Sequence, residues 1–200
     1  GIHPHAASEF SNDSIADLRH LLTQPGVVAI GETGLDFHRN LAPKEMQVKC
    51  FEAHLSLASE IELPLFMHER EASKLQIDIL KNRRKDFSKG VIHCFTGDRQ
   101  TLYQYLDMDL HIGITGWICD PRRGMPLQDL VADIPLDRLM IETDSPYLLP
   151  RNLAFPPKDG RNEPSFLPWV VCGIAACRGE SKEEIAEQTG KTAIKFFGLE

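Results

Sequence analysis

Four short apolar runs in this chain each lead into one residue that can bind a metal ion. The runs are residues 27–31 before Glu32, 64–67 before His68, 90–92 before His93 and 138–141 before Asp144. The intervals between them are far too long for a local zinc finger, and they suit strands that are separated by helices. Such a chain predicts a parallel α/β barrel with a metal site at the carboxyl edge of its strands.

Length and composition favour one folded domain over residues 1–200. Hydrophobic residues make up 42% and charged residues 26%, which provides a core and excludes a disordered chain. No apolar stretch reaches about 18 residues, so we expect no membrane insertion. The five cysteines form no Cys-x-x-Cys pair, which favours a reducing, cytoplasmic compartment. A net charge of −7 argues against a nonspecific nucleic-acid coat but permits an enzyme that holds a few phosphates.

Helical and strand patterns alternate along the rest of the chain. They predict a further strand at residues 110–114, a strand stub at 1–5 and a long helix whose first position is Pro43. Residues 118–125 and 146–164 are predicted to be loops, and the second is long enough to be functional. Since a closed (β/α)8 barrel needs eight strands and typically about 250 residues, we expect this chain to lack roughly two strands.

Two histidines and two carboxylates in equivalent positions form a mixed nitrogen and oxygen donor set. Neutral imidazole is the commonest metal ligand, and a carboxylate buried at a strand end must be paired or bind a metal. The set suits zinc, manganese or magnesium, singly or as a pair, and does not choose among them. His3 and His5 would face the same site if their segment were a strand.

Other polar residues could serve either the site or only the fold. Asp36 is interpreted as a group behind the ligands or as a turn cap, and Arg70 as a phosphate contact or a surface ion pair. Loop arginines suit phosphate, and loop aromatics could stack on a base or anchor the loops. These loop residues are Arg122, Arg123, Arg151, Arg161, Trp117 and Tyr147. The remaining histidines, interpreted as surface or structural, are His20, His38, His54 and His111.

Seven motifs, in their order and spacing, resemble the TatD family of metal-dependent deoxyribonucleases. They are Gly-Ile-His-Pro-His at 1–5, Ala-Ile-Gly-Glu-Thr-Gly-Leu-Asp at 29–36, Pro-Leu-Phe-Met-His-Glu-Arg at 64–70, Val-Ile-His-Cys-Phe-Thr-Gly at 91–97, Ile-Gly-Ile-Thr-Gly-Trp-Ile-Cys-Asp at 112–120, Leu-Met-Ile-Glu-Thr-Asp-Ser-Pro-Tyr-Leu-Leu-Pro-Arg at 139–151 and Arg-Asn-Glu-Pro at 161–164. The resemblance covers essentially the whole chain. It implies a TIM-barrel metallohydrolase that cleaves phosphodiester bonds, often as a 3′→5′ exonuclease on single-stranded DNA or RNA. It also implies that the first two strands and most of the third are absent here.

The resemblance implies specific roles for residues of this chain. The metal ligands would be Glu32, His68, His93 and Asp144, which are the four residues that end the apolar runs. His3 and His5 would lie near the substrate phosphate or the wall of the site, and the Arg-Asn-Glu-Pro motif would help to fix the C-terminal loops. We expect Asp144 also to orient a water and accept its proton, with His3 and Arg70 offsetting phosphate charge. Single-stranded DNA or short nucleic-acid ends are the expected substrate of a monomeric enzyme.

Two other functions fit the same residues. A metallohydrolase of the same fold could act on an amide or a lactone, because the fold does not fix the function. An inactive barrel that only binds nucleic acid or a partner is the second alternative. The complete ligand set argues against an inactive barrel, so a metal-dependent hydrolase is the prediction.

Overall fold

Five parallel strands form one sheet in the computed structural model, which describes residues 1–199. The strands are β1 (Ile30–Asp36), β2 (Leu65–Arg70), β3 (Gly90–Ile92), β4 (His111–Ile114) and β5 (Leu139–Ile141). Each strand pairs in parallel with the next one in the sequence. Sequential parallel strands joined by helices are the repeating unit of a TIM-type barrel, so the predicted fold class is confirmed. The number of strands that precede β1 in a complete barrel stays a prediction.

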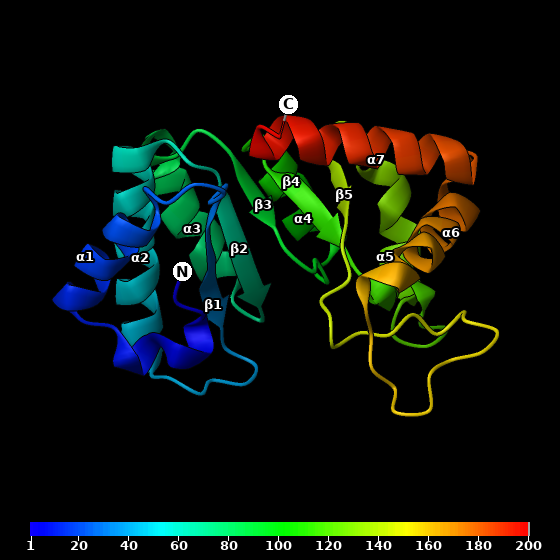
Figure 1. The fold of residues 1–200 in the computed structure, drawn as a ribbon, viewed down its shortest axis with the longest axis horizontal. Coiled ribbons are helices and arrows are strands. Elements are labelled where there is room, and N and C mark those ends of the chain that lie inside the picture. Colours follow the sequence, from blue (N-terminus) through cyan, green and yellow to red (C-terminus); the bar gives the residue numbers. More distant parts are fainter. Residues whose placement is uncertain (200) are drawn as a thin grey trace.

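Helices connect the strands and cover the sheet. They are α1 (Asn12–Leu21), α2 (Lys44–Ile61), α3 (Ser73–Asn82), α4 (Arg99–Leu106), α5 (Met125–Leu130), α6 (Leu167–Arg178) and α7 (Lys182–Phe197). Short 3₁₀ segments are η1 (Pro4–Glu9), η2 (Arg84–Asp86), η3 (Gly116–Cys119), η4 (Val131–Asp133) and η5 (Pro164–Phe166). None of the helices in residues 1–199 combines the length and the hydrophobicity needed to cross a membrane. The strand arrows of β1 and β2 point toward the lower side of Figure 1, where the loop after β5 also lies, whereas α7 runs along the upper edge.

Local sequence signals account for the helix ends. The Asp98 side chain accepts a hydrogen bond from the Thr101 backbone and caps α4, and Ser181 caps α7 in the same way. Gly179 ends α6 with a φ of 89°, which is the left-handed conformation that favours glycine. Pro43 precedes the first residue of α2 in an extended conformation, so the predicted start of this helix is wrong by one residue.

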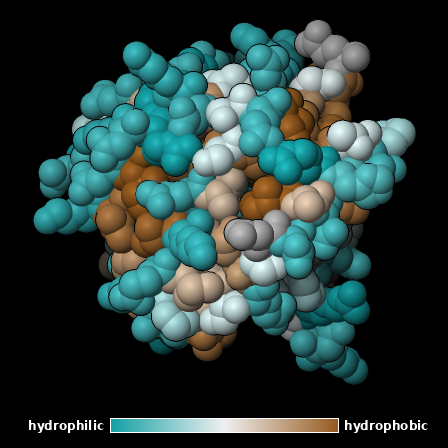
Figure 2. Space-filling view, turned by 90° about the vertical axis from the view of Figure 1, so that its left-hand side faces the viewer, coloured by the Kyte–Doolittle hydropathy of each residue, from teal (hydrophilic) through white to brown (hydrophobic). Residues whose placement is uncertain are grey.

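Apolar side chains of the strands and helices form the core. Met67, Ile92 and Ile112 from the strands belong to one buried cluster with Phe51 of α2 and Tyr105 of α4. Parallel sheets are normally covered on their faces in this way, and the packed core holds the strand ends in place. The side of the molecule that carries α1 and α2 is mostly hydrophilic, with apolar areas between the polar side chains (Figure 2).

His54 of α2 is a fully buried structural histidine that holds the N-terminal segment against the helix. Its Nδ1 lies 2.7 Å from the Cys50 carbonyl oxygen, and the Ile2 backbone N–H donates to its Nε2 at 3.1 Å. A neutral ring with its proton on Nδ1 therefore satisfies both nitrogens. Burial lowers the pKa of His54 to about 4, consistent with that neutral form. The contact with Ile2 also positions the neighbouring His3.

Several predicted element boundaries are wrong. β1 begins at Ile30 and continues through Asp36, so Glu32 lies inside a strand rather than after one. His68 likewise lies inside β2. Residues 1–5 form no strand, because η1 begins at Pro4, whose ring lacks the N–H that a strand ladder uses. The predicted loop at 118–125 contains the end of η3 and the first residue of α5.

Candidate metal centre

Glu32 lies at a bulge where the pairing of β1 with β2 skips one residue. Gly31 pairs with Phe66 and Thr33 with Met67, so Glu32 has no partner on β2. A Cβ atom at Gly31 would lie 2.3 Å from the Phe66 carbonyl oxygen, so the close approach of the two strands requires glycine. Bulges re-aim side chains beside functional sites, and this one directs the Glu32 carboxylate toward neighbouring histidines.

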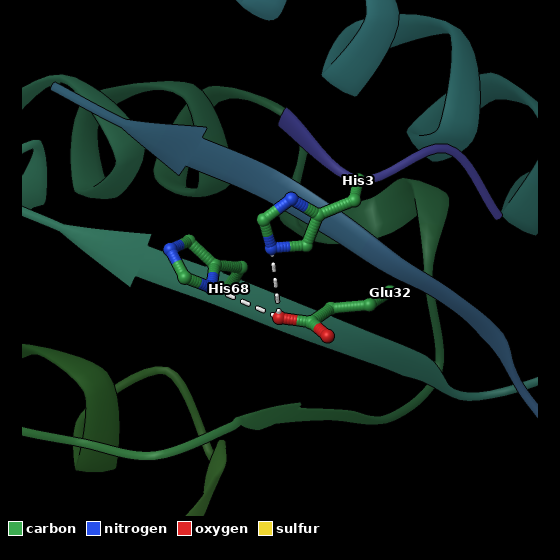
Figure 3. Close-up of side chains that lie close together, drawn as sticks. All are labelled: His3, Glu32 and His68. Carbon is green, nitrogen blue, oxygen red and sulfur yellow. Dashed lines mark hydrogen bonds and ion pairs between the residues drawn. The ribbon is translucent and has the colours of Figure 1, made fainter. Parts of the chain in front are cut away.

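Three imidazole rings surround the Glu32 carboxylate, and two of them appear with it in Figure 3. Glu32 Oε1 lies 2.9 Å from His68 Nδ1, 3.4 Å from His3 Nε2 and 4.0 Å from His93 Nε2. One ligand atom from each of His3, Glu32 and His68 lies within 4.8 Å of the other two. Imidazole nitrogens and a carboxylate oxygen at these separations can share one divalent ion.

His93 connects this cluster to Asp144. His93 Nε2 lies 3.3 Å from Asp144 Oδ1, and both residues follow the ends of their strands, β3 and β5. Cys94 and Asp144 have φ values of 48° and 58°, which are uncommon for residues other than glycine and often mark functional sites. The structure therefore brings all four predicted ligands together, in the spatial order Asp144, His93, Glu32 and His68.

The charges and free atoms of the cluster fit a divalent cation. Burial alone would raise the pKa of Glu32, but hydrogen bonds from His3 and His68 lower it well below its usual range. Burial would lower the pKa of His93, but the Asp144 and Glu142 carboxylates raise it to about 10. The site therefore favours a positive charge, which a metal ion can supply. His68 Nε2 is buried without a hydrogen-bond partner within residues 1–199, although Asp36 Oδ2 lies 3.3 Å away.

Glu142 supports His93 from the side opposite to the cluster. Its Oε2 lies 2.7 Å from His93 Nδ1, and its Oε1 accepts a hydrogen bond from the Cys94 backbone at 2.5 Å. Gly113 of β4 leaves the necessary space, because a Cβ atom there would lie 2.3 Å from Glu142 Oε1. With Nδ1 as the donor, Nε2 is the nitrogen that remains free for a metal ion. Sequence reasoning missed this role, and its only signal was a second carboxylate two residues before Asp144.

Asp36 supports the other half of the cluster. This residue is only 1% exposed, and its Oδ2 lies 2.7 Å from His5 Nε2 and 3.3 Å from His68 Nε2. Its Oδ1 also accepts a hydrogen bond from the Arg39 backbone, so Asp36 caps a turn and also lies beside His68, one of the predicted ligands. Burial would raise the pKa of Asp36, but the bonds from Arg39 and His5 lower it. His5 therefore contacts Asp36 rather than Glu32.

The other predicted residues lie around this cluster. Arg70 ends β2 two residues after His68, so its side chain leaves the same face of the strand, and its contact with phosphate stays a prediction. Asn162 of the Arg-Asn-Glu-Pro motif is buried and donates to the carbonyl oxygens of Thr143 and Tyr147 at 2.8 and 2.7 Å. These two bonds bracket Asp144 and fix its loop, as predicted. Of the other histidines, His20 and His38 are exposed and His111 packs against Phe196.

A sequence-family model described as TatD related DNase matches residues 1–198 of the chain. The chain belongs to the TatD family. Its relative in Rahnella sp. (strain Y9602), named 3′-5′ ssDNA/RNA exonuclease TatD, is 50% identical over 100% of this chain and 76% of its own length. A relative of the same name in Erwinia amylovora (strain ATCC 49946) is 52% identical over 100% of this chain and 77% of its own length.

Solved structures of TatD proteins have the same fold. The TatD homologue YjjV of Escherichia coli K12 superposes with a TM-score of 0.88 at 29% identity, over 98% of this chain and 74% of its own. A TatD family hydrolase from Entamoeba histolytica superposes with a TM-score of 0.86 at 27% identity, over 98% of this chain and 73% of its own. The chain thus spans about three quarters of the length of these TatD proteins, and both comparisons support a hydrolase.

Proposed function

We propose that this TatD chain is a metal-dependent exonuclease that cleaves single-stranded DNA, and also RNA, from the 3′ end. This is the activity that the names of the Rahnella and Erwinia relatives give. The observation that carries the proposal is the joined cluster, in which one carboxylate oxygen lies within 4.0 Å of three imidazole nitrogens. A phosphodiester carries a negative charge that such a site can offset only with a cation.

The residues that would hold one or two divalent ions are Glu32, His68, His93 and Asp144, with His3 beside Glu32. Their mixed oxygen and nitrogen donors suit magnesium, manganese or zinc. When bound, such an ion supplies positive charge for a phosphate oxygen and lowers the pKa of a water molecule. These residues come from two parallel strands, β1 and β2, and from the segments that follow β3 and β5, so the fold itself would position the site.

The side chains around the ions would perform the remaining steps. Asp144 is 31% exposed, so its carboxylate can orient a water that enters from solvent and accept its proton. His3 and Arg70 would offset the charge that develops on the phosphate in the transition state. Glu142 and Asp36 would hold His93 and His68 in place, which matters because small misplacements of reacting groups are costly.

Digestion of a 5′-labelled single-stranded oligonucleotide with Mg²⁺ or Mn²⁺ tests the proposal. The wild type should produce a ladder of products shortened from the 3′ end, and EDTA should stop it. Asp144→Asn should lose at least about 100-fold in rate, because both a ligand and the proton acceptor change. Asp159→Asn removes an equally charged, exposed side chain from the same loop and should cleave normally.

Two results would count against a nuclease. Full activity of Asp144→Asn, or cleavage that resists EDTA, would contradict the assigned metal centre. Hydrolysis of an amide or lactone with no cleavage of any phosphodiester would favour the alternative metallohydrolase.

A further inference from the structure

A hollow of about 610 Å³ lies between η3 and the loop that follows β5. Its lining includes Trp117, Asp120 and Arg123 on one side and residues 148–151 on the other. Pockets of this size hold molecules as large as a nucleotide. The loop lies at the same edge of the sheet as the ends of β1 and β2 (Figure 1).

Direct contacts connect the hollow to the metal centre. Cys94, the neighbour of His93, has its Sγ 3.4 Å from Thr115 Oγ1. The Trp117 backbone N–H in turn donates to Thr115 Oγ1 at 3.5 Å. The opposite wall belongs to the loop that carries Asp144. A chain-like ligand with one phosphate at the metal centre could therefore continue into the hollow.

Buried Asp120 organises the charged groups of the hollow. Asp120 is only 3% exposed. Its Oδ1 accepts hydrogen bonds from the backbone N–H groups of Arg122 and Arg123, both at 2.9 Å. Its Oδ2 lies 3.0 Å from Arg151 Nε, while the Arg151 side chain is 54% exposed. The guanidinium of Arg151 is thus fixed at one nitrogen and accessible at its others, a geometry suited to a phosphate.

An aromatic ring completes the hollow. The guanidinium carbon of Arg123 lies 5.7 Å from the centre of the Trp117 ring, and the ring itself is only partly buried. Bases of single-stranded nucleic acid stack on aromatic rings and on arginine planes. Two arginines face one carboxylate here, so the hollow is locally positive in a chain of net charge −7.

We propose that this hollow is a nucleotide subsite for single-stranded substrate. One base joins the stack of Trp117 and Arg123, and Arg151 binds a phosphate next to the one at the metal centre. The proposal rests on the proposed nuclease function for its substrate. An acidic peptide would use the arginines but would gain little from the ring, so the ring distinguishes the two ligands.

Binding in EDTA tests the subsite independently of hydrolysis. Fluorescence anisotropy of a labelled single-stranded oligonucleotide should show binding about tenfold weaker for Arg151→Gln and for Trp117→Leu, within the range found for loss of one stacked base. Trp117→Phe keeps an aromatic face and should restore most of the affinity. Arg19→Gln removes a similarly exposed arginine on α1, outside the hollow, and should bind as the wild type does.

Kinetics separate the subsite from the metal centre. With Mn²⁺, Arg151→Gln should raise the KM for the oligonucleotide by about tenfold. The KM for bis(p-nitrophenyl) phosphate should rise several times less, because this small substrate does not reach the hollow. Equal binding by Arg151→Gln and Arg19→Gln would overturn the subsite, whether or not the protein cleaves DNA. Because Arg151 is exposed, its variant should fold even if Trp117→Leu does not. If the variants differ in binding as expected but the protein cleaves no oligonucleotide, only the proposed nuclease function would be contradicted.

Discussion

Glu142 should fix His93 rather than bind metal itself, and Glu142→Gln tests this role. In the structure the two carboxylate oxygens face two donors, His93 Nδ1 at 2.7 Å and the Cys94 backbone N–H at 2.5 Å. Glutamine has one acceptor oxygen, so one of these N–H groups would meet an amide NH₂ instead. The change removes one charge-assisted hydrogen bond, worth about 1.5–3 kcal/mol.

This loss should appear in the metal affinity of the protein. The bond to Nδ1 keeps His93 Nε2 free and aimed at Asp144, from which it is separated by 3.3 Å. At about 1.4 kcal/mol per factor of ten, the expected loss in affinity is about 10- to 150-fold. Calorimetric titration with Mn²⁺ or Zn²⁺ measures it. Glu187→Gln removes the same charge from an exposed pair with Lys191 on α7 and should bind metal normally.

Two outcomes would refute this reasoning. Wild-type affinity in Glu142→Gln would show that the carboxylate does not hold the ligand. Unchanged affinity with lost cleavage at saturating metal would place Glu142 in the reaction itself. Gly113→Ala on β4 should displace the Glu142 carboxylate from the same contact, because the added Cβ would lie 2.3 Å from Glu142 Oε1. If both variants act through this contact, their combination should lose little more than either alone.

Two further predictions concern the protonation of histidines. Burial lowers the pKa of His54 from 6.5 to about 4. Between pH 6.5 and about pH 4 the unfolded chain therefore binds a proton that the folded chain does not. The free energy of unfolding should fall over this range by about 3 kcal/mol at most. Urea unfolding between pH 7 and 5 should show that the stability of His54→Gln falls less steeply with pH than that of the wild type. Part of the fall should remain, because the pKa of His111 is also lowered to about 4. An equal pH dependence of stability in the two proteins would contradict this explanation. Since carboxylates raise the pKa of His93 to about 10, metal binding at pH 7 should release about one proton. Calorimetry in two buffers of different ionisation enthalpy measures it, and identical heats would exclude the release.

The sequence predicted the positions of the candidate ligands better where they follow short strands than where they lie inside longer ones. His93 follows β3 directly, so the end of the apolar run located it correctly. Glu32 is different because β1 continues past it through Thr33, Gly34 and Leu35. Glycine and threonine resemble a loop in the sequence, but here they are buried because β2 lies alongside in a shifted register. A bulge depends on two strands at once and leaves no periodic signal in either.

The supporting residues were less predictable than the ligands because their partners are distant in the chain. Glu142 and His93 are 49 residues apart, and Asp36 and His5 are 31 apart. Residue type and position along a strand indicate which side chains reach the sheet edge. They do not indicate which of two nearby carboxylates, Glu142 or Asp144, faces the metal side of an imidazole. That choice depends on the space that Gly113 leaves on the adjacent strand.

His93 and His68, two of the predicted ligands, each have one carboxylate at each ring nitrogen. Glu142 contacts His93 on one nitrogen and Asp144 lies near the other, while Asp36 and Glu32 lie on the two nitrogens of His68. Four carboxylates around neutral imidazoles would repel one another without a cation, and in the metal-free protein a proton on His93 supplies that charge. We therefore expect Glu142 and Asp36 to orient the rings and also, through their charge, to strengthen metal binding. This explains why a mutation of Glu142 is expected to affect affinity before it affects the chemical step.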